Sequence, residues 1–181
     1  MTLPLGLAHF TALEVPPVEL VRLAADAGFA AVGLRLFPAY PGAVFYELPD
    51  GSDANRAMRA AMAASGVSLH DIETVTIDAA FSVEGIDRVF EAGASLGARR
   101  VTVSGDAPEC GRLCANFAAL CDLAAPYGLA VDIENMAWRR VRTFADALAL
   151  VEAAARPNAG VLVDALHFFR NGSAPAELRA A

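Results

Sequence analysis

One pattern of hydrophobic and polar positions recurs along the chain. An alanine-rich helical segment ends at a glycine, and a short apolar run follows directly. The glycines are Gly28, Gly66, Gly97 and Gly128, which gives steps of 38, 31 and 31 residues, and a fifth copy has Pro157-Asn158 instead. Glycine closes a helix in the left-handed conformation without a Cβ penalty. The step length is that of one strand followed by one helix.

This pattern predicts six strands that alternate with helices. The strands are expected near residues 4–10, 30–36, 67–73, 99–104, 129–134 and 159–164. The helices are expected near residues 16–27, 53–65, 83–96, 109–127 and 141–155, and residues 174–181 are expected to open a sixth helix. Strict alternation of the two element types is typical of an α/β protein with a parallel sheet and helices outside it.

Two architectures fit this order, an open doubly wound sheet and a closed barrel. The doubly wound fold usually has a phosphate-binding G-x-G-x-x-G turn after its first strand. Residues 9–17 read His-Phe-Thr-Ala-Leu-Glu-Val-Pro-Pro, and no such motif follows any predicted strand. The sequence therefore favours a TIM-type (β/α) barrel.

Composition and charge narrow the classes of function. Hydrophobic residues make up 56% of the chain and charged residues 19%, which suits one domain with a large core. The net charge of −7 leaves no basic footprint of the kind that nucleic acid requires. No apolar run reaches the roughly 20 residues that span a bilayer, and the N-terminus lacks a basic signal-peptide region. We expect a cytoplasmic protein that binds neither nucleic acid nor membrane.

The predicted strands end at polar or titratable side chains. In chain order these are His9, Arg35, Glu73, Ser104 with Asp106, Glu134, and Asp164 with His167 three residues later. Catalytic groups of TIM barrels lie at the C-terminal ends of the strands. The sequence therefore predicts a functional site at that edge of the sheet.

Glu134 and Asp164 are the strongest candidates, because they end two strands that are neighbours in the predicted order. Adjacent strands lie roughly 5 Å apart, so two inward-pointing carboxylates there must share a proton or a cation. Carboxylate oxygens with an imidazole nearby suit Mg, Mn, Co or Zn. We predict that the two acids bind a divalent metal ion.

The other strand-end residues also have structural interpretations. Asp106 is expected to cap the helix that follows it, and Glu73 fits a structural role as well as a functional one. His9 fits a core histidine equally well, and Arg35 fits either an ion pair or a contact with a substrate anion. His70, one position out of step with the site-facing set, is expected to be structural.

Two segments carry a family resemblance. Residues 131–138, Val-Asp-Ile-Glu-Asn-Met-Ala-Trp, and residues 160–170, Gly-Val-Leu-Val-Asp-Ala-Leu-His-Phe-Phe-Arg, resemble the sugar phosphate isomerase/epimerase superfamily. These are the xylose isomerase-like TIM barrels, which also include endonuclease-four-type enzymes. Residues 5–10, 32–38 and 69–73 support the resemblance, which covers essentially the whole chain.

The resemblance implies a divalent metal held by Glu134 and Asp164, and an Asp-x-x-His motif in which His167 contacts the substrate. It also implies proton transfer beside a carbonyl or hydroxyl oxygen, with Glu134 and His167 as catalytic groups. The residues expected on the substrate side of a carbohydrate-like ligand are His9, Arg35, Glu73, Trp138 and His167.

Two departures from the family pattern affect this prediction. Asn135 and Ala137 stand where related sequences are expected to have Phe and Pro, which would reshape the loop bearing Trp138. A TIM barrel has roughly 250 residues and this chain has 181, so strands seven and eight, with a further His and Glu ligand, are missing. We expect one domain over residues 1–181, an incomplete barrel of about six strands. Its open edges predict a homo-oligomer or a partner chain.

Three functions remain open. The first is an isomerase or epimerase, or a related lyase or dehydratase, whose site is completed by another chain. The second is a catalytically inactive barrel that acts as a binding or assembly module. The third is an endonuclease-four-like nuclease, against which the acidic charge and the presence of only three histidines count.

Overall fold

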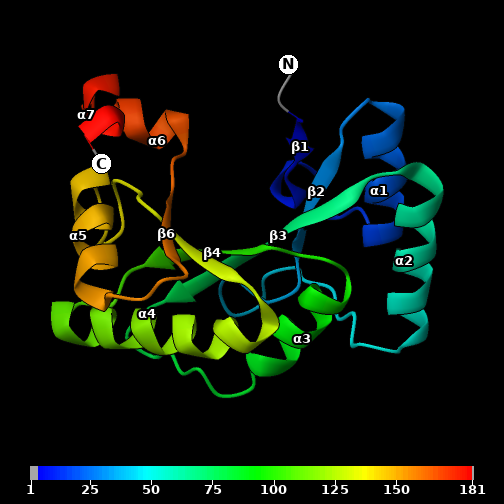
Figure 1. The fold of residues 1–181 in the computed structure, drawn as a ribbon, viewed down its shortest axis with the longest axis horizontal. Coiled ribbons are helices and arrows are strands. Elements are labelled where there is room, and N and C mark those ends of the chain that lie inside the picture. The colour runs from blue at the N-terminus through cyan, green and yellow to red at the C-terminus, as the bar shows by residue number, and fades with distance from the viewer. Residues whose placement is uncertain (1–3, 181) are drawn as a thin grey trace.

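The computed structural model describes residues 4–180 and contains one sheet of six parallel strands (Figure 1). The strands are β1 (Gly6–Leu7), β2 (Ala31–Arg35), β3 (Ser68–Ile77), β4 (Arg100–Gly105), β5 (Ala130–Glu134) and β6 (Ala159–Leu162). The α-helices are α1 (Pro17–Asp26), α2 (Asp53–Ser65), α3 (Asp87–Ser95), α4 (Cys110–Ala124), α5 (Phe144–Ala154), α6 (Ala165–Arg170) and α7 (Pro175–Ala180). Two 3₁₀ turns, η1 (His9–Ala12) and η2 (Ala125–Tyr127), complete the order.

Each strand pairs with its neighbours in chain order, so the sheet runs β1-β2-β3-β4-β5-β6. Helices α1 to α5 follow the outside of the sheet in an arc, and β1 and β6 lie at its two ends (Figure 1). Within residues 4–180 these two strands do not pair with each other. The predicted fold, an incomplete TIM-type barrel with outer helices, is confirmed. No helix in this part of the chain is long and apolar enough to cross a membrane.

The glycine repeat has the expected conformation. The four repeat glycines at 28, 66, 97 and 128 have φ between 69° and 89°, the left-handed region. In the fifth copy the chain turns at Ala155, the only non-glycine residue with positive φ in the part described, which caps α5. The glycines between predicted helices and strands therefore mark the helix ends of the structure.

The sheet has an apolar outer face and a polar inner face. Along β5, Val131 and Ile133 join the core shared with the helices, while Asp132 and Glu134 alternate with them. Along β4, Thr102 alternates in the same way and bonds across the inner face to a β3 side chain. Because alternate residues of a strand point to opposite faces, the polar residues line the inside of the partial barrel.

Several predicted boundaries were wrong. The first strand covers only Gly6–Leu7 rather than 4–10, because the backbone N–H groups of His9 and Phe10 turn away and donate to Glu73. The third strand runs on to Ile77, so Glu73 lies within β3 and not at its end. The sixth strand stops at Leu162 rather than at residue 164, and α6, which was not predicted, begins directly after Asp164. Of the segment 174–181, residues 175–180 form α7 and residue 181 lies outside the described residues.

Candidate metal centre

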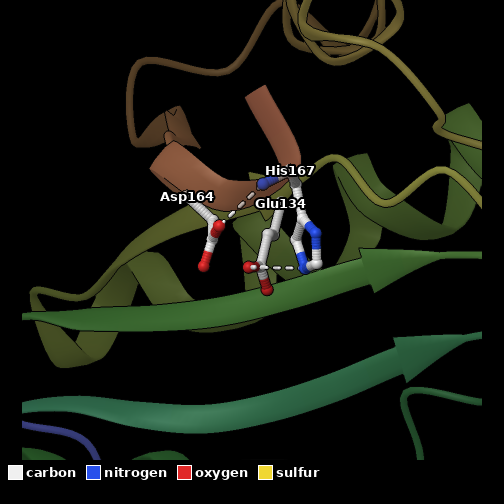
Figure 2. A group of neighbouring side chains, drawn as sticks. All are labelled: Glu134, Asp164 and His167. Carbon is white, nitrogen blue, oxygen red and sulfur yellow. Dashed lines mark hydrogen bonds and ion pairs between the residues drawn. The ribbon is translucent and has the colours of Figure 1, made fainter. Parts of the chain in front are cut away.

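Glu134, Asp164 and His167 come together at the C-terminal edge of β5 and β6. Each offers one ligand atom, and these atoms all lie within 4.8 Å of one another. His167 Nε2 is 4.0 Å from Glu134 Oε1. Figure 2 shows the three side chains converging, with the Glu134 carboxylate between the other two. The structure thus brings together the two acids predicted as metal ligands and the histidine predicted beside them.

Local backbone chemistry positions Asp164 and His167. Asp164 is the N-cap of α6, and its Oδ1 accepts a hydrogen bond of 2.9 Å from the backbone N–H of His167. Such a bond satisfies one of the N–H groups left free in the first turn of a helix. The three-residue spacing of the motif is therefore the spacing of a helix cap, which holds both side chains at one end of α6.

Glu134 is the last residue of β5 and its side chain is nearly buried, with an exposed fraction of 12%. Burial, followed by the negative charge of Asp164, raises the pKa of the Glu134 carboxyl from 4.5 to about 7. Near neutral pH this site therefore holds a proton or needs a cation.

Trp138 packs edge-on against His167, with ring centroids 5.0 Å apart, and its indole is 65% exposed. Asp106 anchors the Trp138 loop: its carboxylate accepts hydrogen bonds from Arg139 Nη1 at 2.8 Å and from the backbone N–H of Arg140 at 3.2 Å. The expectation that Asp106 caps the following helix was wrong, because α4 begins only at Cys110. Asp106 instead ties the end of β4 to the loop after β5.

His9 lies apart from this group and is fully buried. Its Nε2 bonds to the backbone oxygen of Val15 at 3.0 Å, and its Nδ1 accepts a bond of 3.1 Å from the backbone N–H of Arg35. The ring also stacks on Tyr46. Both ring nitrogens are thus engaged by the fold, an arrangement that requires the neutral imidazole. Burial accordingly lowers the pKa of His9.

Arg35 and Glu73 are register partners on β2 and β3. The Glu73 carboxylate accepts backbone N–H bonds from His9 at 2.9 Å and from Phe10 at 3.2 Å, and Arg35 Nη2 lies 3.8 Å from it. A Cβ at Gly33 would clash with Glu73 Oε1, so the glycine leaves the space that this carboxylate fills. Burial, followed by the charge of Asp71, raises the pKa of Glu73.

The sequence prediction missed a polar layer deeper inside the sheet. Arg100 forms a bidentate ion pair with Asp132, and Thr102 donates a 2.8 Å bond to Asp71. A cavity of about 160 Å³ is lined by these four residues with His70, Val161 and Leu162. Asp71, Thr102 and Asp132 lie within their strands and Arg100 begins β4, so a search of C-terminal strand ends passes over them. The alternation of polar residues along β4 and β5 was the available signal.

The chain matches the model of one known protein family. Residues 21–181 match the model of a family described as xylose isomerase-like TIM barrel. The chain belongs to this family. A search of curated protein sequences found no match.

Three solved structures illustrate the likeness. A fusion of a xylose isomerase-like TIM barrel with 4-hydroxyphenylpyruvate dioxygenase has a TM-score of 0.79 at 22% identity, and the IolI protein with a bound zinc atom has 0.78 at 19%. D-allulose 3-epimerase from Methylomonas sp., in complex with D-allulose, has 0.72 at 17%. Matches cover 100%, 99% and 97% of this chain but only 30%, 69% and 67% of those chains. Other neighbours are described as a 3-keto-D-glucoside 4-epimerase, a probable 3-DHS dehydratase and a family 2 AP endonuclease.

The donor set fits a divalent ion. Two ligands about 2.1 Å from a shared ion lie at most about 4.2 Å apart. The 4.0 Å between His167 Nε2 and Glu134 Oε1 meets this limit, and the Asp164 ligand atom lies within 4.8 Å of both. Two carboxylates with one imidazole match Zn, Mn or Co chemistry.

Metal affinity is expected to fall as the pH is lowered through about 7. The pKa of Glu134 is about 7, and a proton and a cation compete for the same carboxylate. Below that pH the apparent affinity for Mn²⁺ should drop about tenfold per pH unit, as measured by calorimetry between pH 5.5 and 8. An affinity that stays constant over this range would contradict the assignment of Glu134 as a ligand.

Proposed function

We propose that the chain is a metal-dependent isomerase or epimerase of carbohydrate-like substrates, with Glu134 and Asp164 as metal ligands. The observation that carries this proposal is the convergence of two carboxylates and one imidazole within 4.8 Å at the C-terminal strand edge. Membership of the xylose isomerase-like family and its epimerase neighbours support the reaction class.

In this proposal Glu134 and His167 are the catalytic groups for the transfer of a proton to and from a substrate carbon. When bound, the ion would act as a Lewis acid that polarises a carbonyl or hydroxyl oxygen of the substrate, and a polarised carbonyl acidifies the C–H bond next to it. Glu134 would hold the ion through one carboxylate oxygen and exchange a proton with that carbon through the other. His167 Nε2 lies 4.0 Å from Glu134 and is placed to hold a substrate hydroxyl. The exposed Trp138 ring offers an apolar surface for the C–H face of a sugar.

We also propose that another copy of this chain, or a partner chain, completes the site. Two protein ligands, Glu134 and Asp164, leave most positions on an octahedral ion for other donors. Both β1 and β6 are sheet edges within residues 4–180, and Leu166 and Phe169 of α6 are more than half exposed. An unpaired edge beside exposed apolar side chains favours association. Light scattering should find a dimer or larger species, and a stable monomer at micromolar concentration would contradict this part.

The test of function is metal-loaded catalysis. Protein loaded with Mn²⁺, Co²⁺ or Zn²⁺ is expected to exchange solvent deuterium into a ketose or a keto acid at the carbon next to the carbonyl, followed by NMR. Chelated protein should lose this exchange and regain it with metal. The Glu134→Gln variant should lose most of this exchange. Glu91→Gln makes the same chemical change on the exposed side of α3, and this matched control should retain the exchange.

The alternatives give different results in the same assay. A catalytically inactive binding module would show a metal-induced rise in melting temperature without exchange, or no response to metal. A dehydratase would release water from a hydroxy-keto substrate and form a conjugated double bond, which ultraviolet absorbance detects. A nuclease would cleave abasic DNA with the same metals.

A further inference from the structure

Arg35 is a buried cation whose hydrogen-bonding capacity is not met within the fold. Its side chain is 7% exposed, and its Nε has no hydrogen-bond partner among the described residues. A guanidinium has five N–H donors and no acceptor, and it is costly to bury without partners.

The neighbouring carboxylate does not meet this need. Glu73 Oε2 lies 3.8 Å from Arg35 Nη2, too far for a hydrogen bond. Glu73 already accepts bonds from the backbone N–H groups of His9 and Phe10, which hold it in place. Glu73 therefore balances charge near Arg35 without satisfying its donors.

The position of Arg35 is rigid. Its backbone N–H donates to His9 Nδ1 at 3.1 Å, and its backbone oxygen accepts a bond of 2.9 Å from the N–H of Tyr46. The Phe10 ring lies 6.0 Å from its guanidinium carbon. A preorganised arginine loses little conformational entropy when a ligand binds.

Arg35 faces the same interior as the candidate metal centre. It ends β2 in register with Glu73, and Ser104 and Glu134 are register partners on β4 and β5 at the same edge of the sheet.

We propose that Arg35 binds a carboxylate of the substrate, so that the site takes hydroxy or keto acids of the sugar-acid type rather than neutral sugars. This inference rests on the proposed function for the reaction and on Arg35 for the substrate class. The two Nη–H groups lie in one plane and match the two oxygens of a carboxylate, whereas Nε is closed off from solvent. A monoanion suits the site better than a phosphate dianion, because the Glu73 carboxylate, 3.8 Å from Arg35 Nη2, adds negative potential.

The subsite is tested with small probes on metal-free protein, so that its outcome does not depend on the metal centre. Acetate is titrated against wild type while the Arg35 Nε–H resonance is followed by NMR, with acetamide as the neutral isostere and inorganic phosphate as the competing anion. Acetate should shift the resonance and saturate at millimolar concentration. Acetamide should leave it unchanged, and phosphate should bind at least tenfold more weakly than acetate.

Variants separate binding from folding. Arg35→Met should weaken acetate binding tenfold or more, Arg35→Lys should restore part of it, and Arg22→Met, altered at an exposed arginine of α1, should bind as wild type does. Equal acetate affinity in wild type and Arg35→Met would overturn the proposal, and tighter binding of phosphate would overturn the choice of carboxylate. If Arg35→Met fails to fold, an Arg35 resonance in wild type that does not respond to acetate also overturns it. If wild type binds acetate but its melting temperature and deuterium exchange do not respond to metal, the proposed function is rejected and the Arg35 subsite is not.

Discussion

Replacing Glu134 by glutamine is expected to remove the response to metal and, at pH 8, to make the metal-free protein more stable. The two effects have one cause. A nearly buried carboxylate whose pKa is raised to about 7 is costly to ionise in the fold, and a divalent cation is what offsets that cost. Glutamine keeps the shape of the side chain and removes the charge.

The size of the pKa shift of Glu134 sets the size of both effects, the gain in metal-free stability and the lost response to metal. A carboxyl whose pKa rises from 4.5 to about 7 on folding costs up to about 3 kcal/mol of stability above pH 7, and nothing below pH 4.5, where it is protonated in both states. Glu134→Gln should therefore raise the melting temperature of the metal-free protein by roughly 6–12 °C at pH 8 and by little at pH 4. Metal at 100 times its Kd should stabilise wild type by about 2.7 kcal/mol and the variant hardly at all.

Calorimetric melting with and without Mn²⁺ measures both effects, and the deuterium-exchange rate of Glu134→Gln should fall by about 10²–10⁴-fold. Glu91→Gln makes the same chemical change at an exposed position and should alter none of these quantities. If Glu134→Gln keeps the metal-induced rise in melting temperature, Glu134 is not a ligand.

Replacing His9 by alanine is expected to destabilise the fold by about 3–4 kcal/mol. The imidazole is fully buried and joins three segments: it accepts the backbone N–H of Arg35, bonds to the oxygen of Val15 and stacks on Tyr46. Alanine leaves a cavity and a backbone N–H of β2 without its acceptor. Denaturant unfolding at pH 7.5 measures the loss.

The pH dependence of the loss in stability tests whether the His9 imidazole causes it. Burial, and then the charge of Arg35, lowers the pKa of His9 below 6.5, so its contribution is complete above pH 6.5 and is lost as the pH falls towards the folded-state value. The stability difference between wild type and His9→Ala should therefore shrink below pH 6.5. His70→Ala, which alters an exposed histidine of β3, is the matched control and should cost less than about 0.5 kcal/mol. A difference that stays constant between pH 7.5 and 5 would contradict the role assigned to His9.

The candidate metal ligands were predictable because strand ends in a parallel sheet meet at one edge. Glu134 follows an apolar alternation that marks β5, and Asp164 follows the next strand along the chain. The N-cap role of Asp164 was harder to see, since α6 has only six residues and no apolar periodicity long enough to predict it. Asp164 is both the N-cap of α6 and a candidate metal ligand.

The environment of Arg35 and Glu73 was beyond sequence reasoning. Glu73 was expected at a strand end, yet β3 continues four residues further because its later part pairs with β4 up to Gly105. The backbone donors that hold Glu73 come from residues 9 and 10, more than 60 positions away. No local pattern shows that the guanidinium beside it has an unsatisfied Nε.

From its sequence alone, this chain is an α/β protein with a parallel sheet, helix ends at its glycines and acids at neighbouring strand ends. These features depend on interactions within a few residues, namely the left-handed preference of glycine and the two-residue period of a strand. Tertiary structure alone decided which other polar groups meet: His9 with Arg35, Arg100 with Asp132, and Glu73 with the backbone of residues 9 and 10. Those contacts join positions far apart in the chain, and packing sets their distances.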